Sequence, residues 1–409
     1  MTAGAKRTGA PGESAARGAD LDGLLAGRLR RSLSGGVLDR REAVVVLDDG
    51  FSQWTVELDH GRGRVRRGSA LTPTLVIHGT AAVLADVVSG TRSGVHAFLD
   101  GDVTIRGDLG LSLMLDGLFG EEERPASFPR AHESTVMGIR TCYLEAGPRD
   151  APPVLLLHGL GATNASLLPC IADLATDHRV IAPDLPGFGS SAAPSAAYSP
   201  AWFAAWVEEL QRQLDIRPAV LLGNSLGGRI ALEQALTHPR SVRALALLTP
   251  SPAFRRLRQL VPAVRLLRPE LGSLPVPMSH RLVVEAIRAM LSDPDRLPRA
   301  WYDAAADECV RVFRSRAHRV AFWATARQIF VEEAHGVNGF WDRLPQLTPP
   351  ALFVWGDRDR LVPPGFAAHV AEALPDAQSV VMADCGHVPQ FEHPAPTMAL
   401  VRAFLAELA

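Results

Sequence analysis

The chain reads Gly223-Asn224-Ser225-Leu226-Gly227-Gly228 between an apolar run, Ala219 to Leu222, and a helical pattern, Arg229 to Ala235. A G-x-S-x-G motif in this strand–turn–helix context is typical of a nucleophile elbow, in which the serine adopts a strained backbone conformation at a sharp turn. The flanking glycines let the strand and the helix cross closely. We therefore predict that Ser225 presents its hydroxyl at a helix N-terminus, where partial positive charge favours an attacking oxyanion.

Strand-length apolar runs on both sides of this motif alternate with helical stretches. The runs show little apolar–polar alternation, which is typical of strands buried on both faces, and the intervening helices are what a parallel sheet requires. We expect an α/β domain with a doubly wound, mostly parallel sheet. The predicted strands are Val154–Leu157, Val180–Ala182, Ala219–Leu222, Ala244–Leu248, Ala351–Trp355 and Ser379–Met382.

The strand pattern disappears between Pro250 and about Pro349, where the chain is helical and rich in arginine. An insertion of this size after one strand predicts a helical cap, about residues 250–349, over the carboxyl edge of the sheet. Ligands bind at that edge in open α/β sheets.

Two later loops supply the partners that a serine nucleophile needs. A serine hydroxyl is a weak nucleophile, so it requires a base and a group that orients the base. His387 follows the last predicted strand, and Asp357 and Asp359 follow the strand before it, in the order Ser, Asp, His. We predict His387 as the base and Asp359, further into its loop, as the orienting acid. Asp357 stays open as the alternative.

The loop after Val154–Leu157 is expected to complete the site. We predict that the backbone N–H groups of Leu160 and Leu226 form an oxyanion hole. His158, in the same loop as Leu160, is a candidate substrate contact. We expect no metal and no organic cofactor, and the four cysteines form no C-x-x-C pair.

Length and composition restrict the function further. A chain of 409 residues exceeds the size of one hydrophobic core, which favours two domains. The formal net charge of -2 argues against nucleic acid as a partner. Lys6 is the only lysine, so a phosphate-binding P-loop, a lysine Schiff base and a Ser-Lys dyad are excluded.

The first third of the chain has a different pattern. Residues 1–20 are poor in apolar side chains and are expected to form a disordered leader. From residue 21 to 120, short strands and helices predict a small α+β domain, and residues 121–131, with a charge run and prolines, predict a linker. Within this domain we expect a helix at Leu21–Leu33, strands at Ala43–Leu47, Trp54–Leu58, Thr74–His78 and Val103–Ile105, and a last helix at Leu109–Phe119.

Residues 132–409 resemble the α/β-hydrolase superfamily. Four motifs agree in order: HGLG at 158–161, PDLPGFGSS at 183–191, GNSLGG at 223–228 and GHVPQFEHP at 386–394. The resemblance implies a carboxylic ester hydrolase that acts through an acyl-enzyme, with Asp184 as a structural turn residue. GNSLGG also resembles the elbow of meta-cleavage product hydrolases, which break carbon–carbon bonds, and this stays the alternative. The resemblance implies Asn224 as a candidate substrate contact. Those enzymes usually carry GPG in the oxyanion loop and often tryptophan where Val388 stands.

The N-terminal domain resembles sterol carrier protein type 2 (SCP2). The similarity rests on Phe51–Val56, the helix through Asp86 and Gly90, Ala97-Phe98, and Ile105–Asp108 followed by a leucine-rich helix. It implies an apolar tunnel for a fatty acyl or sterol ligand. A lipid-binding or transfer protein whose hydrolase half is only a scaffold is therefore a further alternative.

The expected partner is a small hydrophobic ester or lipid-like substrate. The N-terminus shows no signal peptide, and no stretch reaches the ~18 apolar residues of a membrane span. We therefore expect a cytoplasmic protein without stable membrane insertion. The sequence does not predict its oligomeric state.

Overall fold

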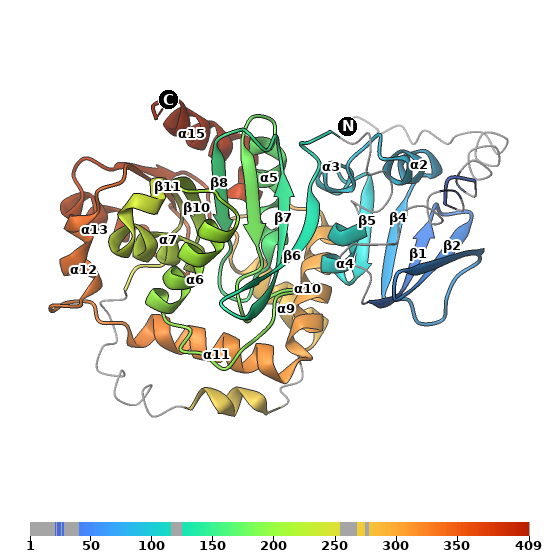
Figure 1. The fold of residues 1–409 in the computed structure, drawn as a ribbon, viewed down its shortest axis with the longest axis horizontal. Helices are drawn as coiled ribbons and strands as arrows, with labels where there is room; N and C mark the ends of the chain where they lie inside the picture. The colour runs from blue at the N-terminus through green and yellow to red at the C-terminus, as the bar shows by residue number, and fades with distance from the viewer. Residues whose placement is uncertain are drawn as a thin grey trace. The chain divides into compact units, whose positions relative to one another are not determined.

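The computed structural model describes residues 41–115, 125–253, 268–274 and 278–408, with a few helical positions between 21 and 27. The chain divides into two compact units, Met1–Pro125 and Ala126–Ala409 (Figure 1). The predicted leader, most of the predicted helix at Leu21–Leu33 and residues 121–124 of the predicted linker lie outside the described residues.

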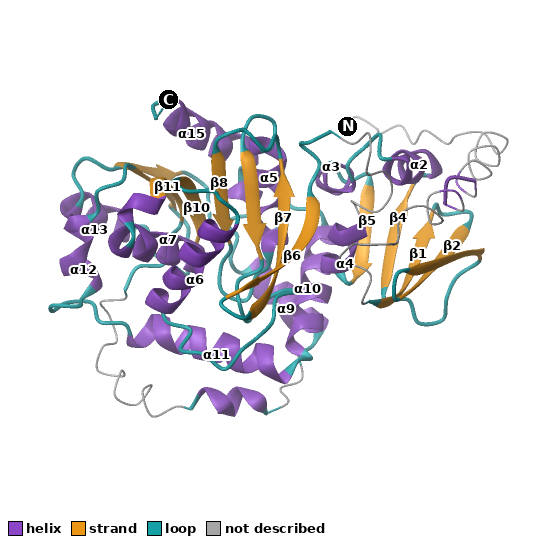
Figure 2. Ribbon diagram, viewed as in Figure 1, coloured by secondary structure: helices purple, strands orange, loops and turns teal. Residues whose placement is uncertain are grey.

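Unit 1 contains a five-stranded sheet in the order β3-β2-β1-β4-β5 (Figure 2). β1 to β3 form an antiparallel meander, β4 pairs in parallel with β1, and β5 is antiparallel to β4. Gly50 adopts a φ of 86° in the turn between β1 and β2, a conformation that favours glycine. The strands are β1 Glu42–Asp48, β2 Gln53–Asp59, β3 Arg62–Arg67, β4 Leu75–Gly79 and β5 Val103–Gly107.

Between residues 41 and 115, three helices pack with the sheet of unit 1. Thr80 caps the first of them by accepting a hydrogen bond from the Val83 amide, and Leu84 and Val88 are buried at helical spacing. The predicted last helix is described as far as Leu115. The helices are α2 Ala81–Ser89, α3 Gly94–Leu99 and α4 Leu109–Leu115. The prediction of a small α+β domain is confirmed.

Unit 2 contains an eight-stranded sheet in the order β13-β12-β11-β10-β8-β9-β7-β6. The six strands from β8 to β13 run parallel, as predicted from their apolar runs. Their bounds are β8 Pro153–Leu157, β9 Arg179–Pro183, β10 Ala219–Asn224, β11 Val242–Leu248, β12 Ala351–Gly356 and β13 Gln378–Met382.

The antiparallel edge of this sheet was not predicted. β6 Arg130–Val136 and β7 Ile139–Ala146 form a hairpin, and β7 pairs with β9. Met137 and Gly138 both have positive φ in its two-residue turn, as hairpin turns that match the strand twist require. The predicted linker of 121–131 therefore extends too far, because Arg130 and Ala131 belong to β6. Only Val136 of β6 is fully buried, so this edge strand lacks the apolar run that revealed the others.

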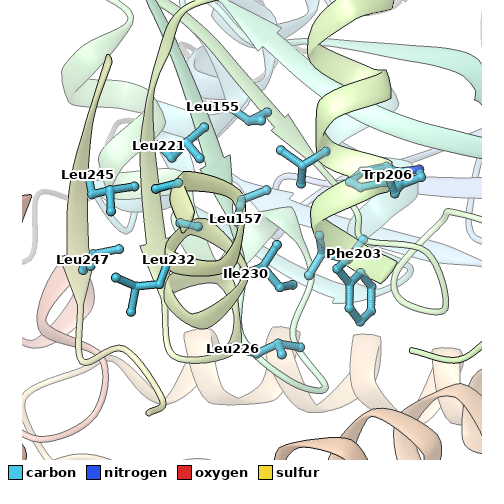
Figure 3. Packing of buried hydrophobic residues seen from close by; sticks show 14 of the residues in the cluster. Leu155, Leu157, Phe203, Trp206, Leu221, Leu226, Ile230, Leu232, Leu245 and Leu247 are labelled. Atoms are coloured by element: carbon cyan, nitrogen blue, oxygen red, sulfur yellow. The ribbon is translucent and has the colours of Figure 1, made fainter. Parts of the chain in front are cut away.

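Helices cover both faces of the sheet, which confirms the doubly wound architecture. α6 packs against α7 on one face, and α5 packs against α15 on the other (Figure 1). Figure 3 shows the buried layer between the sheet and α6 and α7, which includes Leu155, Leu157, Leu221, Leu245 and Leu247 of the strands and Phe203, Trp206, Leu226 and Ile230 of the helices. The covering elements are η1 Asn164–Leu167, α5 Leu168–Leu174, α6 Pro200–Gln213, α7 Leu226–Thr237, η2 Pro239–Ser241, α13 Phe366–Ala373, α14 Pro389–Glu392 and α15 Pro394–Ala406.

The predicted cap enters after β11 and is helical where the structure describes it. Its elements are η4 Pro269–Ser273, α9 His280–Arg288, α10 Arg299–Phe313, α11 Arg316–Val331, α12 Phe340–Arg343 and η5 Leu344–Gln346. α11 crosses the loops after β8 and β9, because a Cβ on Gly161 would lie 3.0 Å from Phe322 and one on Gly187 2.6 Å from Ala321. The cap therefore covers the carboxyl edge of the sheet. None of the helices within the described ranges has the length and apolarity that crossing a membrane would need.

Candidate active site

Ser225 lies on the turn between β10 and α7 with φ 54° and ψ −114°. This positive φ is uncommon for a residue with a side chain and marks a strained turn. A Cβ on Gly223 would lie 2.5 Å from the backbone of Gly227, and one on Gly227 would collide with the Leu157 carbonyl. The prediction that glycines permit this close crossing is confirmed. Ser225 is half-buried and stands at the N-terminus of a twelve-residue helix.

His387 and Asp359 meet although 28 residues separate them. Nδ1 of His387 lies 2.7 Å from Oδ2 of Asp359, and both side chains are buried. The other carboxylate oxygen of Asp359, Oδ1, accepts hydrogen bonds from the amides of Leu361 and Val362 at 2.8 and 2.9 Å. A carboxylate facing Nδ1 assigns the proton of the neutral imidazole to Nδ1, which leaves Nε2 unprotonated and able to act as a base.

Asp357, the alternative acid, has another partner. Its Oδ1 accepts a hydrogen bond from the Cys385 amide at 3.1 Å, and the side chain is exposed. This contact holds the start of the loop that carries His387. Of the two acids, the structure brings Asp359 to the histidine ring.

Cys385 is the nucleophilic side chain nearest to His387 in sequence. Burial raises the pKa of its thiol to about 12, so the thiol stays protonated at neutral pH and is a poor nucleophile.

The loop after β8 lies against the elbow. A Cβ on Gly159 would be 3.4 Å from Cβ of Ser225 and 3.6 Å from Oδ1 of Asn224. Leu160 is the next residue, and Leu226 begins α7, where backbone N–H groups have no partner within the helix. The structure thus brings the loop of Leu160 against Ser225 through Gly159, and Leu226 directly follows the serine.

Asn224 was predicted as a substrate contact, but its amide nitrogen already has three partners within the protein. Its two N–H groups are shared among the Leu248 carbonyl (3.1 Å), Oγ1 of Thr249 (3.0 Å) and the His387 carbonyl (3.3 Å), and the residue is 4% exposed. Thr249 also donates from its hydroxyl to the His387 carbonyl at 2.8 Å. We therefore propose that the NH2 group of Asn224 positions the histidine loop, which leaves only its Oδ1 for a substrate contact.

His158 was likewise predicted as a substrate contact, and the structure shows it fully buried. Its Nε2 accepts a hydrogen bond from the Leu185 amide at 2.9 Å, so Nδ1 carries the proton and donates to the Gly159 carbonyl at 2.8 Å. With both ring nitrogens occupied by backbone groups, the side chain has no atom left for a substrate. We propose that His158 instead shapes the oxyanion loop.

The burial of His158 predicts a stability change with pH. Desolvation lowers its pKa from 6.5 to about 4, so the unfolded state binds a proton that the folded state does not. The free energy of unfolding should therefore fall as the pH drops from 6.5 to 4, by about 3 kcal/mol from this residue. Urea unfolding at pH 7 and pH 5 should show a smaller loss for His158→Gln than for wild type, and equal losses would contradict this assignment.

Sequence reasoning missed Thr249 and an ionic network behind the elbow. Arg229, fully buried on α7, donates to Glu332 at the end of α11 at 3.0 Å and to Glu233 at 2.8 Å. Arg343 donates to the same Glu233 at 2.8 and 2.9 Å. The network joins the end of α11 in the cap to α7, the helix that begins directly after Ser225. The i, i+4 spacing of Arg229 and Glu233 was a signal for part of it, but Glu332 is more than 100 residues away.

Two further sequence interpretations can be compared with the structure. Asp184 accepts hydrogen bonds from the amides of Asn164 and Ser190 at 2.9 and 2.7 Å, which confirms its structural role. Within the described ranges, the donor groups close enough together to hold a metal ion are Glu42, Asp59 and His60. All three are exposed and belong to unit 1.

Comparison with protein families gives two matches along the chain. Residues 152–394 match the family model described as alpha/beta hydrolase fold, and residues 30–120 match the SCP-2 sterol transfer family. Both agree with the architecture of the corresponding unit.

Individual relatives catalyse different reactions. The chain is 31% identical over 284 residues to 2-hydroxymuconate semialdehyde hydrolase of Pseudomonas sp. (strain CF600), covering 67% of this chain and 93% of that protein. It is 29% identical over 265 residues to pimeloyl-[acyl-carrier protein] methyl ester esterase of Aeromonas hydrophila subsp. hydrophila, covering 63% and 96%. Among solved structures, a membrane phospholipase A described as a bacterial virulence factor superposes with a TM-score of 0.59 at 25% identity, covering 80% of this chain and 95% of that one.

Proposed function

Because the chain belongs to the alpha/beta hydrolase fold family and carries an SCP2 domain, we propose that it is a serine hydrolase that cleaves an ester of a hydrophobic or lipid-like substrate. The observation that carries this proposal is the buried contact of 2.7 Å between His387 and Asp359. Asn224, the residue before Ser225, donates a hydrogen bond to the His387 carbonyl and so connects the histidine loop to the elbow. Base, orienting acid and strained serine are the parts that nucleophilic catalysis by serine requires.

In the proposed mechanism, Ser225 Oγ attacks the ester carbonyl while Nε2 of His387 removes its proton. Asp359 keeps the imidazole in the required tautomer and stabilises the imidazolium that forms. The histidine then returns the proton to the leaving alcohol, and an acyl-enzyme remains. Water, activated by the same histidine, releases the acid and regenerates the serine.

The tetrahedral intermediate carries a negative oxygen that needs hydrogen-bond donors. We assign this role to the backbone N–H groups of Leu160 and Leu226, on the two segments that meet at Ser225. Each such donor contributes roughly 3 kcal/mol to lowering the barrier. The positive end of the α7 dipole acts in the same direction.

Carbon–carbon cleavage is the alternative reaction for the same residues. The 31% identity to 2-hydroxymuconate semialdehyde hydrolase supports it. Ester hydrolysis is favoured because the oxyanion loop reads HGLG without the GPG of the carbon–carbon hydrolases, and Val388 follows the histidine where they often have tryptophan. The similarity to a phospholipase and a methyl ester esterase supports an ester as well.

We assign a fatty acyl or sterol ligand to the N-terminal unit. The match to the SCP-2 sterol transfer family supports this assignment. Leu109, Leu113 and Met114 of α4 are buried and serve the core of the unit, so they do not by themselves indicate a ligand. Tethered to the hydrolase, this unit would raise the local concentration of a lipid-like ester.

A panel of nitrophenyl esters of increasing acyl length, with a ring-cleavage dienone beside it, tests the reaction type. We expect ester hydrolysis with kcat/KM rising by up to about fourfold per methylene, since burial of a CH2 is worth about 0.8 kcal/mol. Turnover of the dienone should be far slower. Faster turnover of the dienone than of every ester would favour the carbon–carbon alternative.

The same panel on residues 126–409 tests the contribution of the N-terminal unit. We expect short esters to be hydrolysed as in the full chain and long esters more slowly, because the isolated hydrolase no longer concentrates them. An unchanged chain-length preference would contradict delivery by the SCP2 unit.

A further inference from the structure

The turn that follows α9 in the cap lies directly on the loop that carries His387. The backbone amide of His387 donates to the Met290 carbonyl at 2.9 Å. This hydrogen bond joins the proposed base itself to the cap, almost 100 residues earlier in the chain. The position of the imidazole therefore depends on where the cap turn is held.

The Glu392 side chain forms hydrogen bonds with both the cap turn and the histidine loop. Oε1 of its carboxylate accepts a hydrogen bond from the Gly386 amide at 2.9 Å, and Oε2 accepts one from the Ser292 amide at 2.7 Å. The Ser292 hydroxyl lies 2.7 Å from Oε2 and 2.5 Å from the Asp384 carbonyl, so its proton serves either acceptor. Glu392 is 3% exposed. One buried carboxylate thus holds the residue before His387 and the cap turn at once.

Gly386 shows how closely these segments approach. A Cβ on this residue would collide with the Met290 carbonyl and lie 2.8 Å from both Oε1 of Glu392 and the Ser292 amide. Only a residue without a side chain leaves room for the three groups. The contact is therefore made by backbone atoms of the cap turn and of the histidine loop, and the Glu392 carboxylate binds an amide of each.

We infer that Glu392 is a positioning residue that makes the cap part of the catalytic machinery: it fixes His387 by binding the cap turn Met290–Ser292 to the histidine loop. This inference rests on the proposed function, since it assigns a role to the surroundings of the proposed base. Its consequence is that a group outside the Ser225, His387 and Asp359 set controls turnover without touching substrate.

A second contact makes the inference testable without loss of the fold. Arg296 of the cap donates from Nη1 toward Nε2 of His393 at 2.5 Å and to the carbonyls of Asp384 and Glu392 at 3.4 Å. These contacts use no atom of the Glu392 side chain. The cap therefore keeps an attachment to the histidine loop, through Arg296, when the Glu392 carboxylate is altered.

Glu392→Gln is the decisive variant. An amide of the same shape can place its oxygen toward Gly386 or toward Ser292, and its NH2 group then faces an N–H donor on the other side. We expect kcat for a nitrophenyl ester to fall about 10- to 100-fold, because a displacement of the base by about 1 Å is sufficient for this. KM should change less than threefold, since Glu392 does not contact substrate. Glu392→Asp should recover part of the lost kcat.

Glu308→Gln is the matched control, because Glu308 is another buried cap glutamate and pairs with Arg311 at 2.6 and 2.9 Å. Its kcat should stay within about twofold of wild type. Equal kcat values for Glu392→Gln and Glu308→Gln, with serine-dependent turnover intact, would overturn the positioning role. Turnover that persists in Ser225→Ala would instead overturn the proposed function. A fall in Tm without a fall in kcat would show that Glu392 only stabilises the fold.

Discussion

Ester hydrolysis should fall by about 10⁵- to 10⁶-fold when Ser225 is replaced by alanine. The variant removes the attacking oxygen, so no acyl-enzyme forms, and only binding and the oxyanion donors remain. The fold should persist, because alanine and serine are equally strained at φ 54° and the hydrogen bond from the residue 225 amide to Leu248 uses only backbone atoms. Nitrophenyl ester turnover and labelling by a fluorophosphonate probe measure the loss.

Ser134→Ala is a suitable control, because Ser134 is a partly exposed residue of β6 in the same unit. It should keep wild-type turnover and labelling. Labelling that survives in Ser225→Ala would assign the nucleophile to another residue. If neither wild type nor control is labelled or turns over any ester, the hydrolase unit is a scaffold, and a lipid-binding or transfer protein becomes the better interpretation.

Asp359→Asn should lower kcat by about 10³- to 10⁴-fold. The amides of Leu361 and Val362 both donate to Oδ1, which holds the amide oxygen of the variant on that side. Its NH2 group then faces Nδ1 of His387 and makes this nitrogen an acceptor. The imidazole proton moves to Nε2, and the base can no longer accept the proton of Ser225. Steady-state kinetics at neutral pH measure the effect.

Asp357→Asn is the matched control from the same loop. Asparagine keeps an oxygen that can accept the hydrogen bond from the Cys385 amide, so kcat should fall less than about tenfold. A larger loss in Asp357→Asn than in Asp359→Asn would reverse the assignment of the acid.

Much of the fold could be predicted from local patterns. The parallel strands of unit 2 are buried on both faces and therefore appear as continuous apolar runs, as in Ala219–Asn224 and Ala351–Gly356. The edge strand β6 escaped prediction because it carries polar side chains and leaves no such run. Its one local signal was the turn at Met137 and Gly138.

The sequence by itself determined the elbow at Ser225, because its glycines and the strand and helix beside them are adjacent along the chain. It also determined the order of serine, acid and histidine. Only the tertiary structure decided that Asp359 and not Asp357 reaches His387, since two residues in one loop differ by the direction in which the backbone turns them.

The tertiary structure also decided the roles of His158, Asn224 and Glu392. His158 and Glu392 have both side-chain hydrogen-bonding atoms bound to protein groups, and Asn224 has its NH2 group so bound. For Asn224 and Glu392 these partners lie as far as 163 and 100 residues away in sequence. Residue type and spacing show that a polar side chain lies near the site. Whether it faces substrate or protein depends on which distant backbone groups pack against it. Those long-range contacts cannot be predicted from the residues next to it in sequence.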